Sequence, residues 1–269
     1  HFVRRRQRQM CIRDRLYTQR YDKNFIEIQD FGNETVFKTL KKKGKNKLSY
    51  FNRIIKLLIQ IQSIKHRKVK NFRNQNYVIP KYDKKILINE ANLFCDWYAK
   101  NNLSKLRKKR FCKKFKKIIK ELTLKLKLKD NIFVHRDFHV SNLMSVKNQI
   151  GLIDSQDALI GNKAYDLASL IDDVRLKTSY SFKEKIFKFY IKKQKNLDIK
   201  KFKNDFEILS VLRNLKIIGI FTRLALRDRK KNYLRFIPYT WQLINMRIDQ
   251  NRTFIDLKNL LSQNFKKIK

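Results

Sequence analysis

One short segment carries residues whose types and spacing could transfer a phosphoryl group. It reads HRDFHVSN over residues 135–142, and Asp154 follows twelve residues later. In phosphoryl transfer an acid such as Asp137 accepts the proton of the attacking hydroxyl, while an amide and a second acid hold Mg²⁺ against the nucleotide phosphates. Asn142 and Asp154 have the side chains for that second task. The order of acid, amide and acid therefore indicates a magnesium-dependent phosphotransferase site.

The charge around this segment is opposite to that of the chain. Between residues 137 and 173 there are six aspartates and two lysines, whereas the whole chain carries a formal charge of +43. Carboxylates gathered in so basic a protein favour a shared divalent cation, and Mg²⁺ takes oxygen ligands from one or two carboxylates plus phosphates. The charge pattern thus supports the same chemistry as the spacing.

The elements that must position these residues are two short apolar strands. Ile132–Val134 precedes the loop, and Ile150–Ile153 precedes Asp154. Both have the apolar, β-branched character of buried strands. We expect them to form one hairpin that carries the loop, so that Asp154 approaches the metal from the second strand.

The rest of the chain reads mainly as helices. Phe25–Gly32 alternates apolar and polar residues and ends at glycine, which predicts a strand and a turn. Helical spacing of apolar residues predicts helices over 33–40, 48–64, 87–98, 106–128 and repeatedly from residue 165 onward, with a basic, irregular stretch over 65–81.

Several single residues near the motif have a structural interpretation beside a chemical one. We expect His135 to organise the loop from a buried position, and Asp166, at the start of an apolar helix, to tie the loop down. His139 could contact substrate or only hydrogen-bond within the loop. Asp172 and Asp173 could be no more than a solvated face.

Composition limits the class of protein. The lysine excess is spread over the chain with abundant Asn, Ile and Phe, a mixture typical of an AT-rich genome, so we do not expect nucleic acid as a partner. The three cysteines show no metal-ligand spacing, and no apolar run is long enough to span a bilayer. We expect a cytoplasmic protein with no membrane partner. The oligomeric state is left open.

The chain resembles the aminoglycoside phosphotransferase and choline kinase superfamily. Within it, the resemblance is strongest to the bacterial anomeric kinases of N-acetylmuramate and N-acetylglucosamine, and runs from about residue 16 to residue 238. The segments that carry it are FIEIQDFGNETVF, NEANLFCDWY, FVHRDFHVSNLM, GLIDSQDALIGNKAYDLASLIDDVR and RNLKIIGIFTRLALRDRKKNYLRFIP. The stretches 156–157, 165–167 and 216–228 indicate the narrower family.

This resemblance implies an α+β, protein-kinase-like fold that uses ATP and Mg²⁺. Asp137 would be the catalytic base, and Asn142 and Asp154 the metal ligands. The hinge residues Gln29, Asp30 and Phe31 would hold the nucleotide. The acceptor would be the anomeric hydroxyl of an amino sugar in cell-wall recycling. The candidates for binding the sugar are Glu90, Asp96, His139 and Asp157.

Two departures from the family pattern affect the expectations. Ser155 follows Asp154 where the family usually has an aromatic residue, which favours looser packing there. The nucleotide-binding small lobe should precede the hinge, but Gly32 and Gly44 are too late and too sparse for its phosphate-covering loop. We therefore expect a fragment made mostly of the helical C-lobe with its hinge strand, lacking most of the N-lobe and phosphorylating poorly or not at all.

The expected division of the chain follows from this. Residues 1–15 resemble translated adapter sequence, lack hydrophobic periodicity and have no apolar core of a secretory signal, so we expect a non-native leader and exclude them from the fold. Residues 16–40 would be the hinge strand and the remnant of the small lobe, and residues 41–269 the helical lobe.

Two other functions stay open. An aminoglycoside or choline-type kinase would use the same catalytic residues, and an acidic pocket would suit its cationic acceptor. A non-catalytic, kinase-like protein that binds nucleic acid would explain the charge of +43 and predicts binding that weakens steeply with salt.

Overall fold

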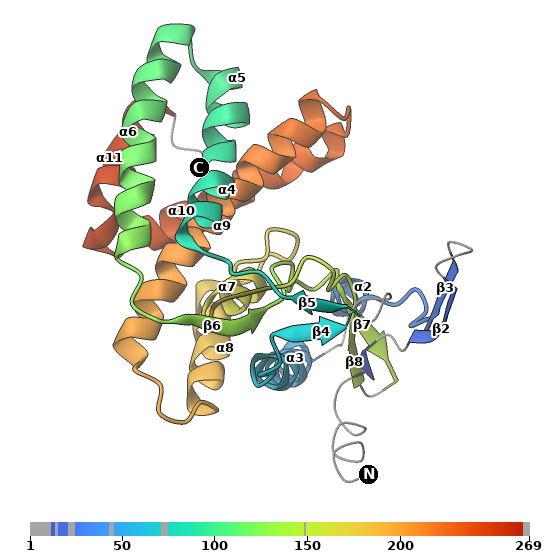
Figure 1. Cartoon of the computed structure of the whole chain (residues 1–269). Coiled ribbons are helices and arrows are strands. Elements are labelled where there is room, and N and C mark those ends of the chain that lie inside the picture. The colour runs from blue at the N-terminus through green and yellow to red at the C-terminus, as the bar shows by residue number, and fades with distance from the viewer. Residues whose placement is uncertain are drawn as a thin grey trace. The chain divides into compact units, whose positions relative to one another are not determined.

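The computed structural model describes residues 12–13, 16–20, 25–42, 46–70, 75–147 and 149–265. Contacts within the chain separate two compact units, whose helices and strands are labelled in Figure 1. Unit 1 comprises His1–Lys81 and Lys129–Asn196, and unit 2 comprises Tyr82–Leu128 and Leu197–Lys269. Both units are therefore built from two separate stretches of sequence.

Unit 1 contains small sheets and four helices in its described residues. The strands are β1 Ile12–Arg13, β2 Leu16–Arg20, β3 Phe25–Ile28, β4 Lys68–Lys70, β5 Asn76–Val78, β6 Asp130–Val134, β7 Leu143–Val146, β8 Gln149–Leu152 and β9 Leu159–Asn162. The helices are α2 Val36–Lys41, α3 Lys47–Gln62, α7 Tyr165–Ile171 and α8 Tyr180–Lys192.

The strands around the HRDFHVSN segment pair differently from the prediction. β6 pairs with β9, and β8 pairs with β7, both antiparallel. The expected hairpin between 132–134 and 150–153 is therefore wrong, because each of these strands has another partner. The two partner strands are only four residues long, and their polar and glycine residues hide the alternation that signals a strand.

Two helices make the core beneath these strands. α3 begins at Asn46, whose side chain accepts a hydrogen bond from the amide of Ser49, and its apolar stripe is buried against β6, β8 and α8. All seven residues of α7 are buried. Because α7 is fully buried, it can give the HRDFHVSN loop between β6 and β7 a fixed support.

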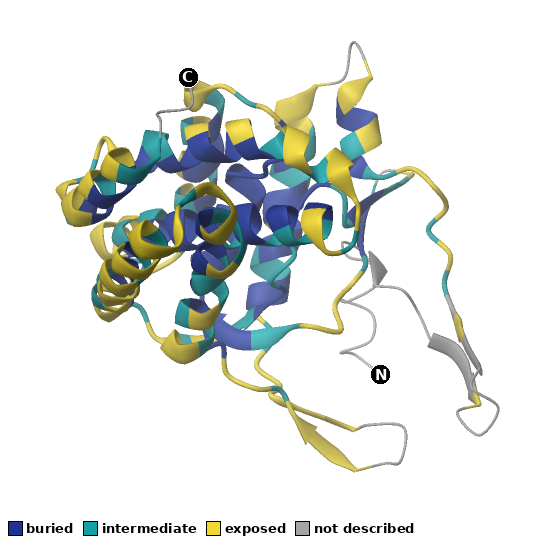
Figure 2. Ribbon diagram, turned by 90° about the horizontal axis from the view of Figure 1, so that it is seen from above, coloured by how far each residue is buried: buried dark blue, intermediate teal, exposed yellow. Residues whose placement is uncertain are grey.

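The segment 65–81, expected to be irregular, contains the β4–β5 ribbon. Lys68 pairs with Val78, and Lys70 with Asn76. Every residue of the two strands is exposed, as Figure 2 shows. Neither face is buried and each strand has three residues, so any alternation of apolar and polar residues is too short to predict a strand.

Part of the stretch excluded from the fold forms a strand. Ile12 pairs with Gly151 and Arg13 with Leu152, so β1 lies parallel to β8 at the edge of the β7–β8 hairpin. The other residues of 1–15 lie outside the described part of the chain. The division at residues 15 and 40 stays a prediction.

Unit 2 is helical in its described residues. Its helices are α4 Lys84–Leu93, α5 Lys100–Asn102, α6 Lys105–Leu124, α9 Ile199–Leu226, α10 Ile237–Ile248 and α11 Ile255–Asn264, with a π-helical turn at Phe94–Ala99 and 3₁₀ turns at Lys231–Phe236 and Arg252–Phe254. The helices predicted over 87–98 and 106–128 are present as α4 with the π-helical turn, and as α6.

α9 is the central helix of unit 2. Seventeen of its 28 residues are buried, on all sides of the helix, because α4, the π-helical turn and α10 pack around it. It lies close to α4 at Gly219, where an added Cβ would lie 2.4 Å from the carbonyl carbon of Leu93. A glycine at this position allows two backbones to touch.

Candidate active site

The loop between β6 and β7 is wound tightly by its own backbone. The amide of His139 donates to the carbonyl of Asp137 at 3.0 Å, and the amide of Asn142 donates to the carbonyl of His139 at 2.9 Å. Phe138 and Val140 are fully buried between these turns. The loop therefore anchors its apolar residues inside unit 1 and leaves Asp137 and Asn142 half-buried at the surface.

The structure brings Asp137, Asn142 and Asp154 together. The side-chain amide of Asn142 donates to the backbone carbonyl of Asp137 at 3.1 Å and to Oδ2 of Asp154 at 3.2 Å. The other oxygen of Asp154 accepts from Nε2 of Gln156 at 2.6 Å. Gln156 was not among the predicted site residues, although it lies two residues after Asp154 and in one of the stretches that indicate the narrower family.

The β7–β8 hairpin brings Asn142 and Asp154 together. Leu143 pairs with Leu152, so the residues just before β7 and just after β8 lie at the same end of the hairpin. The amide of Ile153 also donates to the carbonyl of Asn142 at 3.2 Å. Asp154 has a positive φ of 68°, which directs the chain sharply out of β8.

Asp166 holds the start of the loop. Its carboxylate is 1% exposed and accepts hydrogen bonds from the amides of His135 at 2.7 Å and Arg136 at 3.0 Å. Arg136 has a positive φ of 72°, a conformation that a non-glycine residue adopts at some cost. The two hydrogen bonds to one buried carboxylate stabilise that conformation immediately before Asp137.

His135 is fully buried behind the loop. Its Nε2 lies 3.1 Å from the carbonyl oxygen of Ile153, which can only accept, so Nε2 carries the proton. Burial lowers the pKa of His135 below its ordinary value of 6.5, because the charged ring would be poorly solvated. A neutral histidine in this position links β6 to the residue before Asp154.

Asp173 holds the second half of the loop. Its Oδ2 accepts from the amide of Val140 at 3.2 Å, and its Oδ1 accepts from the amide of Arg175 at 3.0 Å. Asp172 forms an ion pair with Lys183 at 3.3 Å. Both aspartates are 1% exposed, so the solvated face considered for them is wrong. Asp166, in the first turn of α7, and Asp173, just after its end, thus both accept hydrogen bonds from the loop between β6 and β7.

More than half of the chain, residues 43–196, matches the family described as the phosphotransferase enzyme family. The chain belongs to this family. It is 28% identical over 223 residues to the N-acetylmuramate/N-acetylglucosamine kinase of Neisseria meningitidis serogroup B, in a match that covers 81% of this chain and 65% of that one. The chain thus spans just under two thirds of the length of this relative.

Solved structures with the same fold include two other kinases. An ethanolamine kinase of Plasmodium vivax superposes with a TM-score of 0.59 at 12% identity, over 88% of this chain and 70% of its own. The aminoglycoside phosphotransferase APH(2'')-Ib, in its ADP-bound form, gives 0.55 at 15% identity, over 91% and 80%. The expected protein-kinase-like fold, with a mostly helical lobe, is confirmed.

The side chains of Asn142 and Asp154 carry oxygen atoms of the kind that Mg²⁺ prefers as ligands. Asp154 is exposed, and the Asn142 amide lies against it. Among the described residues no three or more His, Cys, Asp or Glu side chains are grouped so that they could share a metal ion. One carboxylate and one amide fit Mg²⁺, which fills its other positions with water and phosphate oxygens.

The residues predicted to hold the nucleotide follow β3. Asp30 accepts a hydrogen bond from the amide of Gly32 at 2.7 Å, and Gly32 has a φ of +71°, so the two make a tight turn. The ring of Phe31 lies over Gly151 of β8, where an added Cβ would be 3.1 Å from the ring. Gln29 is half-buried beside this turn, and its Oε1 has no hydrogen-bond partner in the described residues.

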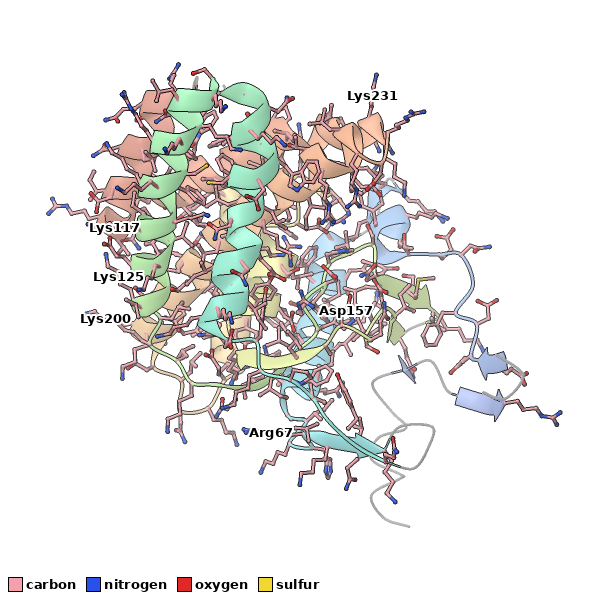
Figure 3. The ribbon with its side chains drawn as sticks, turned by 45° about the horizontal axis from the view of Figure 1, so that its top comes forward. Arg67, Lys117, Lys125, Asp157, Lys200 and Lys231 are labelled. Atoms are coloured by element: carbon pink, nitrogen blue, oxygen red, sulfur yellow. The ribbon has the colours of Figure 1, made fainter. Side chains whose placement is uncertain are left out.

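The predicted sugar-binding residues fall into both units. In unit 1, His139 is 6% exposed, while Asp157 is exposed on the loop between β8 and β9 (Figure 3). In unit 2, Glu90 forms an ion pair with Lys216 at 2.9 Å and accepts a hydrogen bond from the Tyr82 hydroxyl, and Asp96 is exposed on the π-helical turn. Glu90 therefore already has strong partners.

None of the described helices combines the length and the apolar character needed to cross a membrane.

Proposed function

We propose that this protein is an ATP-dependent phosphotransferase that transfers phosphate to the hydroxyl of a small molecule. The observation that carries the proposal is the contact of Asn142 with both Asp154 and the backbone of Asp137, at 3.2 and 3.1 Å. It joins a proton acceptor to two magnesium ligands in the arrangement that phosphoryl transfer needs. Membership of the phosphotransferase family supports the same reaction.

Each residue has a proposed task. Asp137 accepts the proton of the attacking hydroxyl, and Asn142 and Asp154 hold Mg²⁺, which neutralises charge on the nucleotide phosphates. His135, Asp166 and Asp173 keep the loop in place from beneath. Gln29, Asp30 and Phe31 are proposed to contact the nucleotide, and the ADP-bound form of the structural relative supports a nucleotide in this fold.

The proposed acceptor is the anomeric hydroxyl of a cell-wall amino sugar, as in recycling of wall fragments. The support is the relative named N-acetylmuramate/N-acetylglucosamine kinase, which aligns with 81% of this chain. The structural relatives act on other hydroxyl compounds by name, so an aminoglycoside or choline-type acceptor is the competing assignment.

A substrate panel tests the proposal. ADP release is measured with ATP, Mg²⁺ and each of N-acetylmuramate, N-acetylglucosamine, an aminoglycoside and choline, for the chain and for the full reading frame that encodes it. We expect turnover with the amino sugars for the protein of the full reading frame, and the outcomes that follow are judged on that protein. Turnover with choline or the aminoglycoside alone would contradict the acceptor, and turnover with none of the four would contradict the reaction.

Variants of the acids test the roles. Asp137→Asn should lower kcat by about 10²- to 10⁴-fold, the usual contribution of a general base. Asp154→Asn should raise the concentration of Mg²⁺ needed for half-maximal rate. Asp256→Asn, an exposed acid on α11, is the control and should leave both unchanged. Full activity of Asp137→Asn would rule out the base.

A further inference from the structure

The helix α6 of unit 2 carries an unusual density of positive charge. Ten of its 20 residues are lysine or arginine, and a single residue, Glu121, is acidic. In the whole chain, lysine and arginine make up 66 of the 269 residues. Half of this helix is therefore cationic against a quarter of the chain, so the general bias toward lysine does not account for it.

The apolar face of α6 is already used inside unit 2. Phe111, Phe115 and Ile119 are buried where the helix packs against α4 and α11. The opposite face meets solvent, and Figure 3 shows Lys117 projecting away from the unit with a side chain that is 80% exposed. Only the basic face of α6 is therefore available to a partner.

Six residues form the outermost stripe of α6, opposite its buried phenylalanines. They follow one another at intervals of four and three residues, which keeps them on one side of an α-helix. The first and the last are leucines, Leu106 and Leu124, which are 60% and 61% exposed and lie about 27 Å apart along the helix. The four residues between them are exposed cations: Arg110, Lys113, Lys117 and Lys120.

Little in the protein neutralises these cations. Glu121 lies 4.0 Å from the ammonium of Lys117, and among the described residues no other ion pair involves this helix. The first turn adds Lys105, Arg107 and Lys108 and contains no acid, although the helix dipole disfavours positive charge at that end. The charge of this face is therefore available to an anionic partner.

The exposed leucines distinguish a lipid bilayer from a nucleic acid as that partner. Proteins that bind nucleic acid without reading its sequence combine cations with aromatic side chains that stack on bases, and the stripe has no aromatic residue. A bilayer surface instead takes cations among its anionic headgroups and leucines at the boundary of the acyl chains. Because Leu106 and Leu124 lie at the two ends of a straight stripe, a flat surface can contact all six side chains at once.

We propose that the outer face of α6 binds the surface of an anionic lipid bilayer. The four cations of the stripe lie among the headgroups, and Leu106 and Leu124 insert on either side of them. The expectation of no membrane partner was drawn from the lack of an apolar run long enough to span a bilayer, and binding to the surface needs no such run. The inference does not rest on the proposed reaction, since no catalytic or ligand-binding residue enters it.

Sedimentation of the whole chain with lipid vesicles tests the inference. We expect binding to vesicles of phosphatidylcholine with one third phosphatidylglycerol, and little binding to pure phosphatidylcholine. Lys113→Gln/Lys117→Gln should lower the partition coefficient by about 25-fold, because each cation at such a surface contributes about fivefold. The matched control Lys230→Gln/Lys231→Gln removes the same charge from exposed positions and should change it by less than about twofold, since Lys231 lies on the other side of unit 2 (Figure 3).

The leucines test the chemistry of the surface. Leu106→Asn/Leu124→Asn should weaken binding to the anionic vesicles by about tenfold, because two partly buried leucines lose their contact with the acyl chains. The same variant should bind transfer RNA as the unsubstituted chain does, since its charge is unchanged. Leu226→Asn, at an exposed leucine on α9, is the matched control and should bind the vesicles fully.

Three outcomes would overturn the inference. Equal losses in the two lysine variants would mean that binding follows the net charge of the chain and not this face. No binding to the anionic vesicles at low salt would remove the partner. Tighter binding to transfer RNA than to vesicles, weakened by Lys113→Gln/Lys117→Gln and not by the leucine variant, would assign the face to nucleic acid. All the substituted residues are exposed, so each variant should fold, and circular dichroism checks this.

Discussion

Hydrogen bonds hold the loop of unit 1 in place, whereas close backbone packing holds α4 and α9 of unit 2 against each other. In the loop, buried aspartates accept hydrogen bonds from backbone amides: Asp166 from His135 and Arg136, and Asp173 from Val140. In unit 2, α4 and α9 touch through Gly219. There, buried polar atoms of Arg213 and Asn214 have no hydrogen-bond partner among the described residues.

The difference separates two tasks. Hydrogen bonds to fixed acids hold the proposed catalytic groups in one geometry before any substrate arrives, which is what charge stabilisation in a transition state requires. Close packing at Gly219 keeps α9 in place against α4. The loop therefore combines stability with its proposed function, whereas the contact of α4 with α9 contributes to packing.

The largest expected effect comes from removing the acid that holds the loop. Asp166→Ala leaves two buried amides without acceptors and should lower the free energy of unfolding by about 3 kcal/mol, since hydrogen bonds to charged groups are the strong ones. Urea denaturation measures it. Asp157→Ala removes an exposed acid nearby and should change stability by less than about 0.5 kcal/mol. Equal losses would show that Asp166 does not hold the loop.

Sequence reasoning reached the site more fully than the elements around it. The grouping of Asp137, Asn142 and Asp154 was predictable because their side chains and intervals match those that phosphoryl transfer needs. Asp173 was underestimated because it binds a backbone amide, that of Val140, and no side-chain pattern records such a partner. The burial of Arg213 in unit 2 had no signal at all, since it arises only when helices pack around α9.

The fold shows the same division. Long helices such as α3 were predictable from their apolar stripe, because one face meets the core and the other meets water. The exposed ribbon of β4 and β5 has no buried face, and β7 and β9 are too short for periodicity. Strand pairing depends on contacts between distant residues, so the partner of β6 could not be read from the strand itself.

The second-largest expected effect comes from substituting Gly219, and it tests the packing of unit 2. In an exposed helix Gly→Ala gains about 1 kcal/mol of stability. Gly219→Ala should instead cost about 2 kcal/mol, because the new methyl group would lie within 2.7 Å of the Leu93 and Phe94 backbone. Lys200→Ala, exposed on the same helix, is the control. A stabilised Gly219→Ala variant would mean that α4 and α9 do not touch, and the contrast with the loop would fail.

The smallest effect is a dependence on pH that belongs to the loop. Burial lowers the pKa of His135, so the unfolded chain takes up its proton more readily than the folded one. The contribution of His135 to stability is therefore complete above about pH 6.5 and is lost as the pH falls through the lowered folded pKa. Urea midpoints measured from about pH 7 down to about pH 5 should fall for the unsubstituted chain, in the range where histidine titrates. In His135→Gln that slope should be reduced, whereas His66→Gln, at an exposed position, should retain it. An equal slope in all three proteins would mean that His135 is solvated, and the loop would then be less completely fixed from beneath than its hydrogen bonds indicate.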